Sequence, residues 1–228
     1  PEFINLSLHW KLLRFITYSR MTTLIVQTEE IKKKFLSFIP ERRVKVIPNS
    51  VKNIINQKQI KKINDKKLKV LFIGRLEYQK GVDVILDSII EIFNSKNKDD
   101  FKFEIVGNGS LVKLVEDTIK KNNLSNYIKF TRGTSKPSQY MKNSHIILHA
   151  SRYEGMSNVV IEGMSFGKCV ISTKQASSEI ITSNKDGILM ESVSAVQIIK
   201  SLEKISINRV LLKKIGINAI NKIKNNYS

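Results

Sequence analysis

The chain has 228 residues, of which 41% are hydrophobic and 26% charged, enough apolar material for a packed core, so an intrinsically disordered protein is excluded. Its 39 basic and 20 acidic residues give a formal net charge of +19, which favours an anionic partner such as a nucleotide, a nucleic acid or an anionic membrane surface. One cysteine, no run of about eighteen apolar residues and no signal-peptide pattern lead us to expect no disulfide framework, no membrane span and a cytoplasmic location.

The first fifty residues predict a short α/β segment followed by a break in the pattern. Residues 8–18 are apolar, aromatic and basic, which is typical of an interfacial membrane helix and equally of a helix separated from its partner surface. The other predicted elements are a strand at 23–26, a helix at 29–38 and a strand at 44–47. Pro48-Asn49-Ser50 then interrupts the pattern, and a polar, basic connector follows over 52–67. Because position 1 is not methionine, we expect the chain to be part of a longer protein.

Residues 68–73 are almost uniformly apolar, which predicts a parallel strand that is buried on both faces. A helix that extends to residue 93 follows, because its apolar residues recur on one face. Arg75 and Lys80 lie between this strand and this helix, so two cations mark a corner that suits phosphate. Either cation alone would be interpreted as an ordinary surface residue.

A pair of glycines marks the end of the next predicted strand, at 101–106. Gly107 and Gly109 precede an amphipathic helix, an arrangement that suggests a dinucleotide-binding turn. Val112 occupies the place of the third glycine, however, and the following strand ends without an acidic ribose ligand. We therefore expect no NAD.

The remaining predicted elements continue the alternation of strands and helices. Thr131 and Arg132 are expected to follow a strand at 127–130, and a short helix begins at Pro137. The later elements are strands at 146–148 and 169–172 and helices at 194–205 and 210–226. Because this alternation contains no hairpin turns, we predict an α/β fold with a doubly wound parallel sheet.

Between the last two predicted strands, the chain passes through a loop and a helix that carry two carboxylates. Gly155 suits a tight turn, and Ser157-Asn158 suits a helix N-cap. Backbone N–H groups at the start of such a helix are available to phosphate. Glu154 precedes the turn and Glu162 lies more than one turn into the helix, so the two carboxylates would serve different parts of a ligand.

The sequence contains few candidate metal ligands. Cys169 begins an apolar strand and is interpreted as a small core residue. His9, His145 and His149 lack metal-ligand spacing, and the last two flank a predicted strand, where a structural histidine is the usual interpretation. No Asp-x-Asp motif occurs in the sequence. We therefore predict no metal.

Glu154 and Glu162, separated by seven residues in a strand–loop–helix context, resemble the EX7E motif of glycosyltransferase family 4. Gly74-Arg75-Leu76 with Lys80-Gly81, and the turn Val106-Gly107-Asn108-Gly109, resemble further signatures of that family, and the resemblance extends from about residue 46 to 228. The family consists of retaining enzymes with the GT-B fold, in which two Rossmann-like domains face each other. The resemblance implies that residues 1–50 are a remnant of the N-terminal acceptor domain and hinge, and that residues 51–228 form the C-terminal, nucleotide-sugar-binding domain.

The resemblance also implies roles for individual residues. Glu154 would be the catalytic carboxylate facing the transferred sugar, and Glu162 would bind the ribose hydroxyls. The implied donor-binding residues are Arg75, Lys80, Gly107, Gly109, Thr131, Arg132, Gly155, Met156, Ser157, Asn158 and Glu162. No cofactor is implied beyond the substrate, a nucleoside diphosphate sugar, with a UDP-sugar as the first choice.

The expected partners are a nucleotide-sugar donor and a glycan or lipid-linked acceptor, as in polysaccharide or lipopolysaccharide biosynthesis. A basic surface is compatible with peripheral association at the inner face of an anionic membrane. Aromatic residues are few and do not alternate with basic ones, so no nucleic acid is expected. The alternatives are a non-hydrolysing nucleotide-sugar epimerase of the same fold and a non-enzymatic basic module that binds a nucleotide or a membrane surface.

The sequence departs from the family pattern at three places. Gly163 stands where alanine is common, Cys169 stands where proline is common, and residues 173–176 lack the usual pair of glycines near the donor sugar. The last departure leaves the identity of the donor sugar open. Because little of an acceptor domain is expected here, we predict that this chain alone binds nucleotide weakly and catalyses no transfer.

Overall fold

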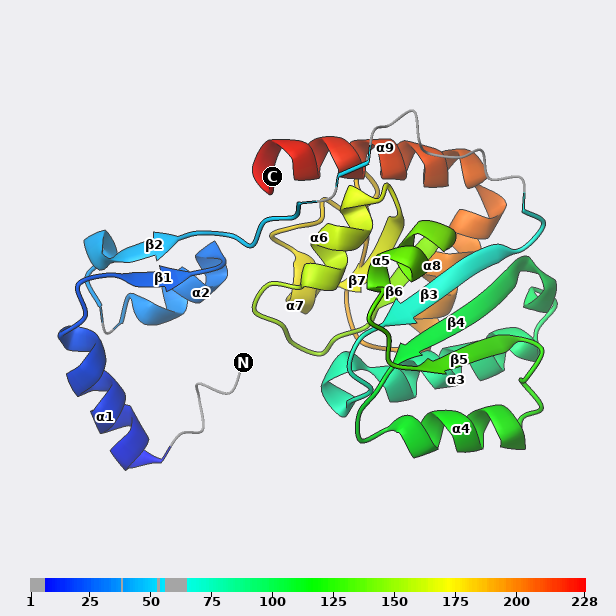
Figure 1. Cartoon of the computed structure of the whole chain (residues 1–228), viewed down its shortest axis with the longest axis horizontal. Coiled ribbons are helices and arrows are strands. Elements are labelled where there is room, and N and C mark those ends of the chain that lie inside the picture. Colours follow the sequence, from blue (N-terminus) through cyan, green and yellow to red (C-terminus); the bar gives the residue numbers. More distant parts are fainter. Residues whose placement is uncertain (1–6, 38, 53, 56–64) are drawn as a thin grey trace.

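Six parallel strands form the larger sheet, in the spatial order β5-β4-β3-β6-β7-β8 (Figure 1). The computed structural model describes residues 7–37, 39–52, 54–55 and 65–228. The strands are β3 (Leu68–Ile73), β4 (Phe101–Gly107), β5 (Ile128–Arg132), β6 (Ile146–His149), β7 (Cys169–Thr173) and β8 (Ile188–Met190). The predicted doubly wound parallel sheet is confirmed.

Helices cover both faces of this sheet. They are α3 (Val82–Phe93), α4 (Val112–Lys121), α5 (Pro137–Asn143), α6 (Asn158–Ser165), α7 (Lys174–Ser177), α8 (Ala195–Ile207) and α9 (Arg209–Asn226). Buried residues of α3, α4 and α8 pack on one face, and those of α5 and α6 pack on the other. The long helix α9 contributes to both clusters, with Leu212 in the first and Ile223 in the second.

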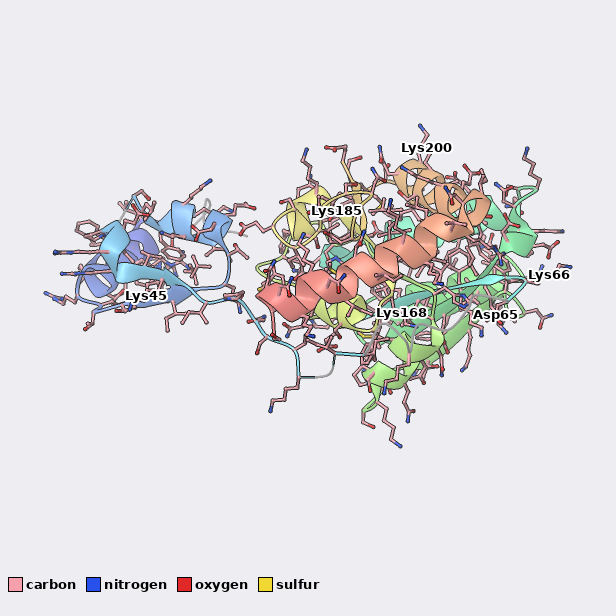
Figure 2. The ribbon with its side chains drawn as sticks, turned by 90° about the horizontal axis from the view of Figure 1, so that it is seen from above. Lys45, Asp65, Lys66, Lys168, Lys185 and Lys200 are labelled. Carbon is pink, nitrogen blue, oxygen red and sulfur yellow. The ribbon has the colours of Figure 1, made fainter. Side chains whose placement is uncertain are left out.

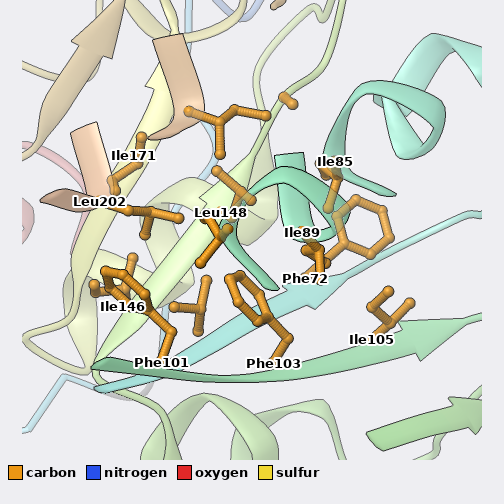
Figure 3. Packing of buried hydrophobic residues seen from close by; sticks show 14 of the residues in the cluster. Phe72, Ile85, Ile89, Phe101, Phe103, Ile105, Ile146, Leu148, Ile171 and Leu202 are labelled. Carbon is orange, nitrogen blue, oxygen red and sulfur yellow. The ribbon is translucent and has the colours of Figure 1, made fainter. Parts of the chain in front are cut away.

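The core explains why these segments are strands. On one face of the sheet, Phe101 and Phe103 of β4 pack with Phe72 of β3 and with α3 residues such as Ile89 (Figure 3). All five residues of β7, which begins with the wholly buried Cys169, are buried. Strands that are buried on both faces favour β-branched and aromatic residues over alternation, as the sequence indicates.

The direction of winding changes at β3. From β3 the chain adds β4 and β5 on one side, then returns to place β6, β7 and β8 on the other. The loops that leave the carboxyl ends of β3 and β6 therefore diverge, and in open parallel sheets this is the place where ligands bind.

A smaller part of the chain forms a separate two-stranded parallel sheet. It contains α1 (Leu8–Ser19), β1 (Leu24–Val26), α2 (Glu29–Phe35) and β2 (Val44–Val46), with a small core that includes Phe35 and Val44. The predicted strands and helix are confirmed, although α2 ends at Phe35, before the predicted end at residue 38, which lies outside the described residues. Most of the predicted connector at 52–67 lies outside them too.

Charged side chains surround both parts of the molecule, with Lys45 on the smaller part and Lys168, Lys185 and Lys200 on the larger (Figure 2). The apolar side chains of α1 are also exposed, among them Trp10 and Phe15. Among the helices that the structure describes, none is long and apolar enough to cross a membrane.

Candidate active site

Lys80 and Glu154 form an ion pair between the loops that leave β3 and β6. The Lys80 Nζ contacts the Glu154 Oε1, and the two side chains are only 15% and 12% exposed. The residues are 74 positions apart in the sequence. They meet because β3 and β6 are neighbours at the point where the winding direction changes. Both were predicted site residues, and the fold brings them together.

Gly81 permits this close approach of the two loops. Its φ is +67°, in the left-handed region, and a Cβ built on it would lie 2.2 Å from the carbonyl oxygen of Ala150, next to the end of β6. A side chain here would therefore be strained by the backbone and would collide with the neighbouring loop. The fold thus requires glycine at position 81 for a structural reason that is independent of any ligand.

Glu154 is held as a carboxylate by its surroundings. Ser151 Oγ donates a hydrogen bond to Glu154 Oε1 at 2.9 Å, and His149 Nε2 lies 3.4 Å from the same oxygen. Burial alone would raise the pKa of Glu154, but hydrogen bonds from His149 and Lys80 and the charge of Lys80 lower it to about 2. Since burial lowers the pKa of His149, the imidazole is neutral near pH 7 and Lys80 supplies the compensating charge.

His149 is the site residue that the sequence did not reveal. Its Nε2 lies 3.0 Å from Ser157 Oγ, and its Nδ1 lies 2.8 Å from Ser172 Oγ, which in turn lies 2.8 Å from Ser177 Oγ. A buried polar chain thus leads from Glu154 towards α7. The available signal was its position as the last residue of β6, at the carboxyl edge of the sheet. The interpretation as a hydrogen-bonded structural histidine agrees with these contacts but did not predict its proximity to Glu154.

The start of α6 offers backbone donors. The amides of Met156, Ser157 and Asn158 have no hydrogen-bond partner among the residues that the structure describes. Ser157 occupies the predicted N-cap position, but its hydroxyl contacts His149 and makes no capping hydrogen bond. The N–H groups at this helix terminus therefore remain available to an anion.

Glu162 differs from Glu154 in its environment. It is half-buried on α6, and burial raises the pKa of its carboxyl. Within the described part of the chain, this carboxylate has no hydrogen-bond or ion-pair partner. A half-buried acceptor without a partner is costly unless a ligand supplies donors. The surroundings therefore lower the pKa of Glu154 and raise the pKa of Glu162.

Arg75 and Gly109 lie in neighbouring loops at the same edge of the sheet, and Gly107 is the last residue of β4. A Cβ on Gly107 would lie 2.0 Å from the carbonyl oxygen of Gly74, so the end of β4 packs directly on the turn after β3. The Leu76 N–H donates to the carbonyl oxygen of Asn108 at 2.8 Å, which fixes the two turns together. Arg75 is exposed, with Nη2 3.4 Å from Gln79 Oε1.

The expectation that Thr131 and Arg132 follow a strand is wrong. They are the last two residues of β5 and pair with Val106 and Gly107, because the β4 partner continues to Gly107. The Arg132 Nη2 contacts both carboxylate oxygens of Glu116 on α4, at 2.6 and 2.7 Å. The Arg132 side chain is thus committed to a surface ion pair.

The segment that follows β2 contacts residues 150–158, which lead from β6 into α6 and are called the motif loop. Asn49 Nδ2 donates to Asn158 Oδ1 at 2.7 Å, and the Asn49 N–H lies 3.2 Å from Met156 Sδ. A cleft between α2 and the motif loop is lined by Thr28, Glu30, Ile31, Lys34, Glu154, Gly155 and residues 175–180. In the part of the chain described, no group of three or more His, Cys, Asp or Glu residues could hold a metal ion.

The sequence matches one protein family and is similar to glycosyltransferases of other organisms. Residues 53–222 match the model of the family Glycosyl transferases group 1. An uncharacterized glycosyltransferase of Methanocaldococcus jannaschii, MJ1178, is 32% identical over 150 residues, which are 65% of this chain and 41% of the relative. The amylovoran biosynthesis glycosyltransferase AmsD of Erwinia amylovora is 28% identical over 185 residues, 78% of this chain and 51% of the relative. The chain thus spans about half the length of these relatives or less.

Solved structures share the fold. A variant of TarM from S. aureus, in complex with fondaparinux, α-GlcNAc-glycerol and UDP, superposes with a TM-score of 0.85 at 23% identity, covering 100% of this chain and 46% of TarM. Anabaena HepE, in complex with UDP and glucose, has a TM-score of 0.81 at 17% identity and covers 98% and 64% of the two chains.

Proposed function

Because the chain belongs to the family Glycosyl transferases group 1, we propose that the edge of its sheet around Lys80, Glu154 and Glu162 binds a nucleoside diphosphate sugar, whose sugar is transferred to an acceptor. The observation that carries this proposal is the half-buried Glu162 carboxylate, which has no partner among the described residues and lies on the helix whose first amides are also unpaired. A nucleoside diphosphate supplies both complements: ribose hydroxyls for the carboxylate and phosphate oxygens for the amides.

Two cations and one helix terminus would bind the diphosphate. Arg75 and Lys80 would contact its oxygens from the β3 side, and the amides of Met156, Ser157 and Asn158 would contact them from the α6 side. Negative charge grows on this group as the glycosidic bond breaks, and fixed donors stabilise such charge in the transition state. Gly107, Gly109 and Gly155 would keep the surrounding turns free of side chains.

Glu154 would contact the transferred sugar. An ionised carboxylate close to the anomeric centre stabilises positive charge that develops there, and the low pKa of Glu154 keeps it ionised throughout the physiological range. As in glycosyltransferase family 4, we propose transfer with retention. The backbone at Thr131 and Arg132 would face the nucleotide base, while the Arg132 side chain remains paired with Glu116.

The donor and acceptor are proposed by analogy with the relatives. The TarM variant and HepE structures contain UDP, so we propose a UDP-sugar donor. AmsD is named for amylovoran biosynthesis and supports a glycan or lipid-linked acceptor. We propose that residues 51–228 form the donor-binding domain, that residues 1–50 belong to an acceptor domain, and that this chain alone is inactive. The net charge of +19 supports a peripheral association with anionic membrane at its cytoplasmic face.

A calorimetric titration with UDP, GDP and ADP tests the proposal. We expect the chain to bind UDP, and Glu162→Ala to weaken binding about 5- to 150-fold, equivalent to about 1–3 kcal/mol for lost hydrogen bonds to a charged group. Glu91→Ala, which removes an exposed glutamate from α3, is the matched control and should leave the affinity unchanged. Absence of binding by all three nucleotides, or equal effects of the two substitutions, would contradict the proposal.

A further inference from the structure

Arg152 joins the loop that carries Glu154 to the turn that carries Lys80. Its Nη1 and Nη2 donate to the two carboxylate oxygens of Asp83 at 2.9 and 2.8 Å. The Nη1 also donates to the carbonyl oxygen of Tyr78, and the guanidinium carbon lies 3.6 Å from the centroid of the Tyr78 ring. The guanidinium is therefore held in its plane by a carboxylate and covered on a face by an aromatic ring.

The residues that Arg152 contacts lie on both sides of Lys80 in the sequence. Tyr78 and Asp83 flank Lys80 on its two sides, and Arg152 precedes Glu154 by two residues. One side chain thus fastens both flanks of the Lys80 turn to the loop that bears the opposite member of the ion pair. The backbone adds to this connection, because the Arg152 N–H donates to the carbonyl oxygen of Gln79 at 2.8 Å.

The ion pair of Arg152 and Asp83 is partly buried and stays charged. The side chains of Arg152 and Asp83 are 21% and 32% exposed, so solvent reaches the pair only in part. Burial alone would raise the pKa of Asp83, but the hydrogen bonds and charge of Arg152 lower it, so the carboxylate stays ionised. Lysine could not replace this arginine, because an ammonium group lacks the planar fork that binds both oxygens and the flat face that stacks.

We propose that Arg152 and Asp83 are a positioning pair for the reaction, which sets the distance between the Lys80 ammonium and the Glu154 carboxylate. This inference rests on the proposed function, since it assigns the pair to the same site. Arg152 acts through Lys80 and Glu154. Its Nη1 and Nη2 groups donate to Asp83 and Tyr78, and it is not itself assigned a contact with the donor. The pair thus keeps the Lys80 ammonium, which binds the diphosphate, at a constant distance from the Glu154 carboxylate, which faces the sugar.

The test measures the ionisation of Glu154, which a merely structural role for Arg152 would not change. Carbon-13 NMR of selectively labelled glutamate follows the Glu154 carboxyl in the wild-type chain, in Arg152→Lys and in Asp83→Asn. The wild-type carboxyl should remain ionised at about pH 4. In both variants the contact with Lys80 loosens, so its titration midpoint should rise to about 4 or above, the ordinary range for a glutamate. The double variant should titrate like either single one, because both remove the same connection.

A matched control and a second readout complete the design. Lys129→Gln breaks a partly exposed ion pair with Glu104 elsewhere on the sheet and should leave the Glu154 titration unchanged. UDP affinity of the two site variants should fall at least about 5-fold. Asp83→Asn keeps the shape of the side chain, so a folded Asp83→Asn chain whose Glu154 titrates as in the wild type would overturn the inference. Failure of the wild-type chain to bind UDP would instead overturn the proposed function, because the Glu154 titration is measured without nucleotide.

Discussion

The Glu179 carboxylate accepts a hydrogen bond at 2.6 Å from the backbone N–H of Glu30, although the two residues belong to different parts of the chain. Its other oxygen accepts from the N–H of Glu29 at 2.8 Å, and Thr28 accepts from the N–H of Ile31. The first turn of α2 thus has its amides satisfied partly by its own cap and partly by a residue that follows α7. This contact connects the smaller sheet to the larger one.

Replacing Glu179 by alanine should weaken that connection. Loss of a helix cap costs about 0.5–2 kcal/mol, and the exposed location of these contacts places the expected loss near 1 kcal/mol. Hydrogen exchange should show faster exchange of the Glu29 and Glu30 amides. Glu191→Ala, which removes an exposed partner of Lys174, is the control and should leave those two amides unchanged. Unchanged protection in Glu179→Ala would mean that the contact is dispensable.

The Lys80–Glu154 pair predicts a pH dependence of stability. Because the folded-state pKa of Glu154, about 2, lies below its unfolded value, its stabilising contribution is fully present above about pH 4.5 and is lost as the pH falls towards 2. Lys80→Met should lower the free energy of unfolding at pH 7 by roughly 3 kcal/mol, because a partly buried carboxylate loses its cation. Denaturant unfolding as a function of pH checks both statements. A wild-type and a variant curve that remain parallel from pH 7 to about pH 3 would refute them.

Two glycines with nearly the same positive φ allow the cost of backbone strain to be distinguished from the cost of a steric collision. Gly81 and Gly133 have φ of +67° and +68°, but a Cβ on Gly81 would meet the Ala150 carbonyl oxygen at 2.2 Å, whereas Gly133 has nothing within 4 Å. Gly133→Ala should cost about 1 kcal/mol for the left-handed conformation alone. Gly81→Ala should cost about 3 kcal/mol or more and should also weaken UDP binding. Thermal unfolding of the two variants measures the difference, and equal losses would show that the Gly81 loop shifts freely.

Arg75 and Arg132 should differ in their effect on nucleotide affinity. The Arg132 guanidinium is paired with Glu116 on the surface, so Arg132→Gln should change UDP affinity by less than about 2-fold. Arg75 follows β3, where its guanidinium makes a long contact with Gln79 and lies near the charge of Glu77. Arg75→Gln should weaken UDP binding about 10-fold. The same calorimetric titration compares them. A larger loss for Arg132→Gln would mean that its side chain leaves Glu116 to bind the donor.

The elements that local patterns define were predictable, and the contacts that strand order defines were not. Apolar runs such as residues 68–73 predicted β3 with its observed bounds, and Gly155 with Ser157-Asn158 predicted the loop and the helix that carry the two glutamates. The end of β5 was missed because its partner strand, not its own residues, sets where pairing stops. Local periodicity contains no information on which strands are neighbours.

The same reason explains the missed side-chain partners. Arg152 and Asp83 are 69 residues apart, and they meet only because β6 lies beside β3. His149 was interpreted from its flanking strand alone, so its distance to Glu154 could not be anticipated. Motif spacing locates residues along one loop, whereas a polar network across two loops requires the topology.

Cys169 gives the sheet a built-in chemical reporter. It is the single thiol of the sequence, it begins β7 with no exposed surface, and burial raises its pKa to about 12. A thiol reagent therefore reacts only when β7 separates from its neighbours, because both access and ionisation require solvent. The rate of modification then measures how often β7 separates from β6 and β8. Slower modification in the presence of a ligand reports binding without any label being added to the protein.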